Sequence, residues 1–258
     1  MFNFVRLFSH PLTKGISIDD PLTTVARREI IKTKPFLFKI YSEWYSEILS
    51  RIIGKIQVLE IGSGAGFLKE ILPSVITSEV FKIDGVDLTV DACKLPFLDN
   101  FLDAIVMTDV FHHIPDIESF LSEATRCIKD NGKIVMVEPW NTKWSRFIFS
   151  KFHHEPFDVN GGWKIPTSGP LSGANGAIPW IVFNRDKEIF DKKFPQWSIN
   201  EISPMMPFSY LISGGVSTRN LVPGFLYKPL RIFEKFFFEK YLSMFAVIEL
   251  QKQKIKIL

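Results

Sequence analysis

The chain has 258 residues, is 46% hydrophobic and carries a formal net charge of +3. This length and apolar content suffice for a full core and suit one α/β domain with additions. The charge is small and dispersed, without a Lys/Arg block, which argues against a nucleic-acid partner. The two cysteines, Cys93 and Cys127, lack framework spacing and predict a reduced, cytoplasmic protein. Residues 1–10 lack the long apolar stretch of a secretory signal.

The first 54 residues are predicted to form a helical cap. Asp20, followed by a proline, marks a helix start that leads into residues 25–34. Pro35 ends this pattern and residues 36–53 resume it. The aromatic residues of the second helix are expected to pack the cap onto the rest of the chain.

A glycine-rich loop opens the main domain, residues 55–258. An apolar run ends in an acidic residue and is followed by three alternating glycines and a helix-like segment. These parts are residues 56–61 with Glu60, then Gly62, Ser63, Gly64 and Gly66, then residues 67–72. The layout predicts a buried strand that turns into a helix beneath a nucleotide-type ligand. Glycine lets the ligand approach the backbone closely, and the helix start offers free N–H groups.

The spacing of the glycines indicates the class of ligand. A dinucleotide fingerprint, G-x-G-x-x-G, would place its third glycine at position 67, where this chain has Phe67. The observed pattern, E-x-G-x-G-x-G starting at Glu60, resembles motif I of the class I S-adenosylmethionine (SAM) dependent methyltransferases. A Rossmann-type NAD oxidoreductase is therefore the less favoured alternative.

Further segments match this family in order over roughly residues 56–140. They are a second strand at 75–79, an Asp91-Ala92 pair followed by Leu95-Pro96-Phe97, a fourth strand at 102–109, a helix at 117–128 and a fifth strand at 133–138. The chain is similar to the small-molecule methyltransferases of the branch that includes the quinone-biosynthesis enzymes. The resemblance implies a Rossmann-like, doubly wound, mostly parallel seven-stranded sheet with an antiparallel edge strand. Residues 243–251 are expected to be the last strand, with residues 198–204 as its partner.

Two acidic residues compete for the ribose of the cofactor. Asp87 lies four residues before Asp91, whereas a crossover between parallel strands needs about a dozen residues. Glu79 lies 19 residues after Glu60, close to the roughly 20 expected in nucleotide-binding units. We therefore assign the ribose to Glu79, keep Asp87 as the alternative, and expect the helix between the second and third strands to be shortened or lost.

The resemblance implies SAM as the cofactor. Glu60 would serve the charged methionine moiety, Glu79 the ribose diol, and Asp91 with the Ala92 N–H the adenine. The full set of expected cofactor contacts is Glu60, Gly62, Ser63, Gly64, Gly66, Glu79, Asp91, Ala92 and Asp109.

Catalysis is less well defined by the sequence. His112 and His113 follow the fourth strand, where a histidine of near-neutral pKa could deprotonate a hydroxyl or enol. His153 and His154, followed by an acidic residue, form a rival set. Adjacent histidines do not share a helix face and no spaced ligands accompany them, so we expect no metal.

Two segments after the fifth strand are expected to meet the substrate or its surroundings. Residues 141–197 are largely aperiodic and are predicted to form a substrate loop or lid. Residues 223–245 are rich in Phe and Leu but contain too many charges to span a membrane. They predict an amphipathic helix that faces the core or a second copy, with peripheral membrane contact as the alternative.

The predicted function is methyl transfer from SAM to a small-molecule acceptor, by O- or C-methylation, with a lipid- or sugar-linked acceptor as one option. The alternative is a catalytically inactive SAM-binding protein, because no residue separates the two. The acceptor, the methylated atom and the oligomeric state do not follow from the sequence.

Overall fold

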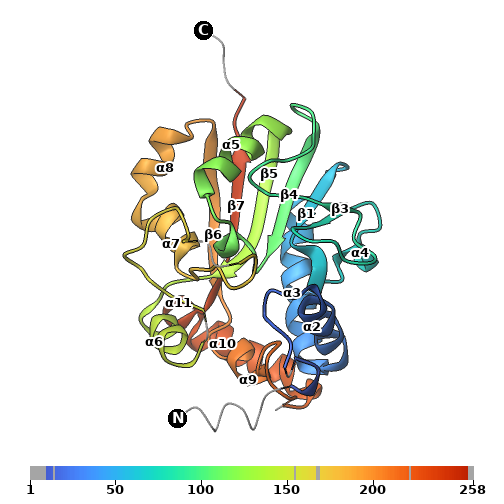
Figure 1. The fold of residues 1–258 in the computed structure, drawn as a ribbon. Coiled ribbons are helices and arrows are strands. Elements are labelled where there is room, and N and C mark those ends of the chain that lie inside the picture. The colour runs from blue at the N-terminus through green and yellow to red at the C-terminus, as the bar shows by residue number, and fades with distance from the viewer. Residues whose placement is uncertain (1–9, 14, 154, 167–168, 221, 255–258) are drawn as a thin grey trace.

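The computed structural model describes residues 10–13, 15–153, 155–166, 169–220 and 222–254. Its centre is a seven-stranded sheet of order β3-β2-β1-β4-β5-β7-β6, covered by helices on both faces (Figure 1). The strands are β1 (Val58–Ile61), β2 (Ile76–Glu79), β3 (Leu88–Thr89), β4 (Leu102–Thr108), β5 (Ile128–Pro139), β6 (Trp197–Met205) and β7 (Phe245–Lys252). β1 to β5 pair in parallel. β7 lies antiparallel between β5 and the edge strand β6. The expected Rossmann-like fold with its antiparallel element is confirmed.

Two α-helices precede the first strand, shorter ones lie between some of the strands, and helices dominate the chain after β5. They are η1 (Pro11–Thr13), α2 (Pro21–Thr33), α3 (Pro35–Arg51), η2 (Ser63–Ala65), α4 (Leu68–Ile71), η3 (Phe111–His113), α5 (Ile117–Cys127), α6 (Lys143–Phe152), α7 (Ile178–Trp180), the π-helical η4 (Ile181–Arg185), α8 (Lys187–Lys193), α9 (Ser209–Ser213), η5 (Gly224–Leu226), α10 (Tyr227–Phe237) and α11 (Glu239–Leu242).

The two faces of the sheet build two hydrophobic clusters, because successive side chains of a strand point to opposite faces. On β4, Ala104 and Val106 join the cluster under α3 and α6, whereas Ile105 and Met107 join the cluster under α5, α7 and α8. All four of these side chains are fully buried. This alternation fixes the register and holds the carboxyl ends of the parallel strands together at one edge.

The N-terminal helices belong to the packed body of the molecule. The Asp20 side chain accepts a hydrogen bond from the Leu22 N–H and Pro21 occupies the first turn, so α2 begins where the sequence predicted. Trp44 and Tyr45 of α3 are buried in the cluster beneath the sheet. The division into a cap at residues 1–54 and a main domain therefore stays a proposal, because buried residues of α2 and α3 share one hydrophobic cluster with the strands.

Three local expectations differ from the structure. The helix expected at 67–72 is only the four-residue α4, because Pro73 follows it and cannot continue a helix. β5 begins at Ile128 rather than 133, since Ile128 pairs with Leu102 before a register shift. The segment after β5 contains α6, whose Thr142 and Ser145 form a capping box. Residues 80–87, which connect β2 to β3, contain no helix, as the short connection predicted.

Candidate active site

A cavity of about 600 Å³ lies at the edge where the parallel strands end. Its floor comes from the ends of β1, β2 and β4 and from the turn after β3. Its walls come from α2, α3 and α6, from the segment after α6 and from residues 210–218. In Figure 1 these walls gather at the lower end of the sheet. Ligands of open α/β folds bind in this position, outside the carboxyl ends of the strands.

The glycine loop packs tightly at the cavity floor. Gly62 has φ of +72°, and a Cβ there would lie 2.3 Å from the Val110 Cγ2 atom. A Cβ on Gly66 would lie 2.2 Å from the Tyr45 hydroxyl. Both glycines line the cavity, and only glycine fits at these positions without displacing a neighbouring side chain. The loop therefore places bare backbone at the cavity floor, as a nucleotide-type site requires.

The two candidates for the ribose lie in different places. Glu79 lines the cavity, and its carboxylate accepts hydrogen bonds from the Gly64 N–H (3.1 Å) and the Val80 N–H (2.9 Å). Asp87 lies outside the cavity lining, where it accepts from the Thr77 N–H and hydroxyl and pairs with Lys69. Each Glu79 oxygen keeps a second lone pair for a hydroxyl group.

Glu60 is a buried acid that forms no ion pair within the described part of the chain. Its side chain lines the cavity and is 3% exposed. Burial, with the nearby charge of Glu79, raises the pKa of Glu60 to about 8, and Arg28 only partly opposes this. A buried carboxyl of this kind is stabilised in its charged form when a positive group binds beside it. An ammonium or sulfonium ligand has the required charge.

The other expected cofactor residues are divided between the cavity and its support. Asp91 and Ala92 line the cavity, and Asp91 also accepts a hydrogen bond from the Cys93 N–H. Ser63 lies behind the loop, where its hydroxyl donates to the Ser78 carbonyl at 2.9 Å. Gly64 lies behind it too and holds Glu79 through its N–H.

The N-terminal helices supply cavity residues that the sequence did not single out. Thr24 and Arg27 of α2 and Tyr41 of α3 line the cavity. The Thr24 hydroxyl is buried without a hydrogen-bond partner in the described part of the chain. Such a group is costly unless it is satisfied, and the adjoining cavity is where a ligand would satisfy it. The place of Thr24 in the cavity lining follows only from the packing of α2 over the glycine loop.

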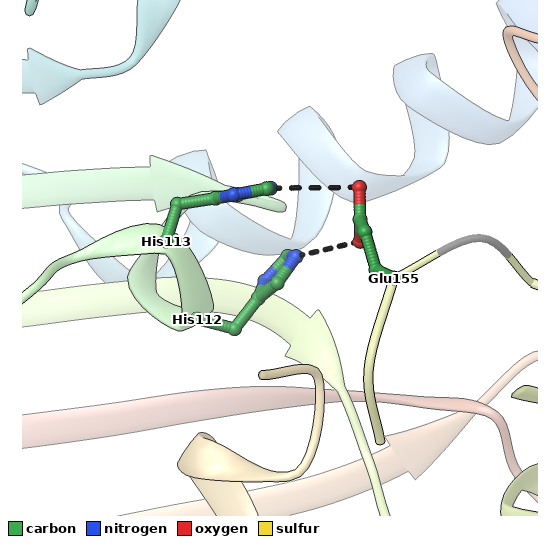
Figure 2. A group of neighbouring side chains, drawn as sticks. All are labelled: His112, His113 and Glu155. Atoms are coloured by element: carbon green, nitrogen blue, oxygen red, sulfur yellow. Dashed lines mark ion pairs between the residues drawn. The ribbon is translucent and has the colours of Figure 1, made fainter. Parts of the chain in front are cut away.

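A second polar group occupies the wall opposite the glycine loop. Figure 2 shows His112 and His113 directed toward Glu155. Their Nε2 atoms lie 3.4 Å and 3.8 Å from the Glu155 carboxylate oxygens. His153 Nδ1 lies 3.7 Å from the same carboxylate, whereas His154 lies outside the described residues. The described histidines of the two rival sets thus lie in one cluster around Glu155.

Glu138 at the end of β5 fixes the position of this cluster. One carboxylate oxygen accepts from the Val110 and Phe111 N–H groups, and the other lies 2.7 Å from His112 Nδ1. Glu138 is fully buried and therefore acts as a rigid support for η3. The sequence pattern indicated residue 138 only as the end of the fifth strand.

Burial and neighbouring charges shift the pKa values of the two histidines in opposite directions. Burial alone would lower the pKa of His112, but the hydrogen bonds to Glu138 and Glu155 raise it well above its usual value. Burial and the charge of His112 lower the pKa of His113 to about 3. His112 is therefore an imidazolium and His113 a neutral ring at neutral pH. His113 lines the cavity, and His112 lies behind it.

Asp109 lies at the end of β4 beside this cluster. It lines the cavity and has φ of +62°, which is rare for a residue other than glycine and concentrates at functional sites. Burial raises the pKa of Asp109 to about 7, with Glu155 and Glu138 adding to the effect and His112 opposing it. Asp109 can therefore exchange a proton near neutral pH.

His112, His113 and Glu155 could also hold a metal ion, since their ligand atoms lie within 4.8 Å of one another. Sequence spacing indicated no such set, because the third ligand lies more than 40 residues from the histidines. The pairing of His112 with two carboxylates gives each of its nitrogens a partner without a metal.

Comparisons with known proteins agree with this geometry. Residues 59–136 match a family model described as a methyltransferase domain. Over 57 residues the chain is 35% identical to a demethylmenaquinone methyltransferase of Streptomyces avermitilis, covering 22% of this chain and 25% of that protein. The chain therefore spans about a quarter of the curated relative that it matches.

Two solved structures share the fold. A chain of the complex between the Haloferax volcanii Trm112 methyltransferase activator and the putative methyltransferase matches with a TM-score of 0.56 and 12% identity, covering 94% of this chain and 100% of that chain. Geranyl diphosphate C-methyltransferase from Streptomyces coelicolor A3(2), solved with Mg²⁺, geranyl diphosphate and S-adenosylhomocysteine, matches with a TM-score of 0.50 and 11% identity, covering 95% and 91%.

Proposed function

We propose that this chain is a class I SAM-dependent methyltransferase and that it transfers a methyl group from SAM to a small-molecule acceptor. The observation behind the proposal is that Glu60, Gly62, Gly66, Glu79, Asp91 and Ala92 line one cavity. A methyl transfer needs little beyond positioning of the two reactants and removal of a proton. The proposed acceptor is an oxygen or an activated carbon.

The cofactor would lie across the glycine loop. Glu79 would accept from the ribose hydroxyls, Asp91 from the adenine amine, and Glu60 would meet the positive charge of the methionine part. Bound there, SAM supplies a methyl carbon already activated by its sulfonium. Asp109 would stand at the boundary between the cofactor and acceptor ends of the cavity.

We propose that Asp109 takes the proton of the acceptor. Its carboxylate is available as a base above its pKa of about 7. Neutral His113 beside it would orient the acceptor hydroxyl, and the charged His112 would hold Glu155 in place behind the cavity. Asp109 would then hold the proton that the acceptor atom loses when it takes the methyl group.

An NAD-type oxidoreductase is the weaker candidate for this fold. Phe67 occupies the position of the third dinucleotide glycine and is packed against Tyr45, with ring centroids 4.9 Å apart. The helix after the loop is only the four-residue α4, so the pyrophosphate-binding helix start of a dinucleotide site lacks its usual length.

Calorimetric titration of the pure protein with SAM, S-adenosylhomocysteine and NAD tests the proposal. We expect the two adenosyl ligands to bind, NAD to bind far more weakly, and Glu79→Ala and Asp91→Ala to lose at least tenfold in affinity, about 1.4 kcal/mol. Asp87→Ala is the matched control and should bind normally, because Asp87 lies outside the cavity lining.

Three results would contradict the proposal. Failure of both adenosyl ligands to bind, or binding of NAD alone, removes the methyltransferase function. Loss of binding in Asp87→Ala with retention in Glu79→Ala reverses the ribose assignment. Binding without methyl transfer to any acceptor in lipid- and small-molecule extracts supports an inactive binding protein instead.

A further inference from the structure

Helix α10 has an inverted distribution of polar and apolar side chains. Arg231 and Glu234 face the interior and are 4% and 0% exposed. Phe236 and Phe237, on the opposite side, are 79% and 67% exposed. Soluble domains bury phenylalanine and leave charged residues in water, so this helix presents to solvent the side that is costly to expose.

The buried charges explain why the helix keeps this orientation. Arg231 pairs with Glu43 of α3 at 2.7 Å, with Glu234 at 2.6 Å and with Glu239 at 2.9 Å. Tyr227 also donates its hydroxyl proton to Glu43. This network ties α10 to α3, and the helix cannot rotate its phenylalanines inward without leaving several charges unpaired in the interior.

The apolar side of α10 continues over its neighbours. α10 contacts α9 and α11, and α11 contacts α6, so the four helices lie side by side at the lower end of the molecule in Figure 1. We call this the aromatic face. Its exposed apolar residues are Phe147 and Phe152 of α6, Leu211 of α9, Phe225 and Leu226 of η5, Ile232, Phe233, Phe236 and Phe237 of α10, and Tyr241 of α11.

The exposed charged residues on the helices of the aromatic face have one sign. The only acidic residues in α6, α9, α10 and α11 are Glu234 and Glu239, and both are paired with Arg231. The exposed charged residues of these helices are Lys143, Arg146, Lys151, Lys228, Lys235 and Lys240. An apolar surface bordered by basic residues is complementary to a layer with anionic headgroups above an apolar interior. A two-fold contact with a second copy would instead bring lysines opposite lysines.

We propose that the aromatic face docks on an anionic phospholipid bilayer. None of the helices among the described residues has the length and apolarity to cross a membrane, so the contact is with its surface. The phenylalanines would enter the boundary between headgroups and acyl chains, and the lysines would meet lipid phosphates. Docking holds whether or not the chain is an enzyme.

The aromatic face also borders the cavity. Phe152 of α6 and Leu211 of α9 are members of the face and line the cavity as well. A molecule dissolved in the bilayer could therefore pass from the docked face to the acceptor end without crossing water. This consequence rests on the proposed function, and it assigns the acceptor to the lipid-soluble class with a methylatable oxygen or carbon.

Vesicle co-sedimentation of the full chain tests the docking. We expect binding to vesicles of phosphatidylcholine with phosphatidylglycerol, little binding to phosphatidylcholine alone, and release at high salt. Phe236→Ser/Phe237→Ser should weaken the partitioning on the order of a hundredfold. Leu98→Ser, at a residue that is 79% exposed just before β4 and outside the aromatic face, is the matched control and should partition like the unchanged protein.

S-adenosylhomocysteine affinity measured on the same samples separates this inference from the proposed function. Normal affinity in the double variant shows that it is folded and that only docking was lost. Three outcomes overturn the inference. They are no binding to either vesicle, equal binding to both vesicles at any salt concentration, or a dimer that the double variant converts to a monomer.

Discussion

At the scale of single residues, the site depends on how burial changes the charges of a few acids. Glu60, Asp109 and Glu79 all have raised pKa values because they lie in a low-dielectric wall. Several buried acids around one cavity favour a positive ligand, because its charge stabilises their ionised forms. SAM, with its permanent sulfonium charge, has the chemistry that this wall favours.

Replacement of Asp109 by asparagine tests its role. Asparagine also tolerates positive φ, so the turn after β4 should be kept. We expect kcat to fall about 10²- to 10⁴-fold, with the affinity for S-adenosylhomocysteine nearly unchanged. Steady-state kinetics with calorimetry separates this result from a cofactor contact, for which affinity would fall instead.

The pH profile gives the sign of the same effect. A carboxyl whose pKa is raised to about 7 is protonated below that pH and is a base only above it. The rate of the unchanged enzyme should therefore rise with pH up to about 7 and level off, and the asparagine variant should lack this step. An unchanged step in the variant would assign the proton transfer to another group.

How much of the site followed from the sequence depends on the distance between its members. Gly62, Glu79 and Asp91 lie on local patterns of strand, turn and acid, and their positions at the cavity were predictable. Thr24 and Glu138 were not, because their roles come from packing between segments far apart in the chain. Their sequence surroundings look like an ordinary helix start and strand end.

At the scale of secondary-structure elements, the strands were easier to predict than the helices. The parallel strands were recognisable as apolar runs, because both of their faces are covered. The phenylalanines of α10 predicted a side facing the core or a second copy, and the structure excludes the core. The structure turns Arg231 and Glu234 inward instead, through ion pairs with α3 that the sequence pattern does not reveal.

Replacement of Arg231 by methionine should destabilise the anchoring of α10. The change leaves the fully buried Glu234 without its cation, and such losses cost about 3–5 kcal/mol. Urea unfolding should show this decrease in the free energy of unfolding. Adding Glu234→Gln should recover part of it, because the uncompensated charge is removed. A fully stable single variant would contradict the role given to this network.

At the scale of the whole molecule, the cavity is bordered by parts that lie far apart in the sequence. α2, the segment after α6 and residues 210–218 all contribute to its lining. A ligand that fills it would tie these parts to the ends of the strands. Binding therefore stabilises more than the glycine loop.

Saturating S-adenosylhomocysteine should raise the thermal stability of the whole chain. At a concentration a hundredfold above Kd the gain is about 2.7 kcal/mol, or roughly 5–10 °C in Tm for a chain near this size. Hydrogen exchange should slow in α2 and in residues 210–218, with α8, remote from the cavity lining, as the internal control. Protection confined to residues 60–66 would contradict a ligand held by all the walls.

The position of β7 affects how the protein can be synthesised. β7 follows β6 by about 40 residues in the chain, yet it lies between β5 and β6 in the sheet. When β6 leaves the ribosome, β7, its neighbour in the described sheet, has not been made, and the backbone groups of β6 stay unpaired. The first five strands can assemble earlier, because each pairs with strands already synthesised or next in line. Translation should therefore produce a nascent chain with a formed cavity floor and an open edge at β5 until β7 emerges.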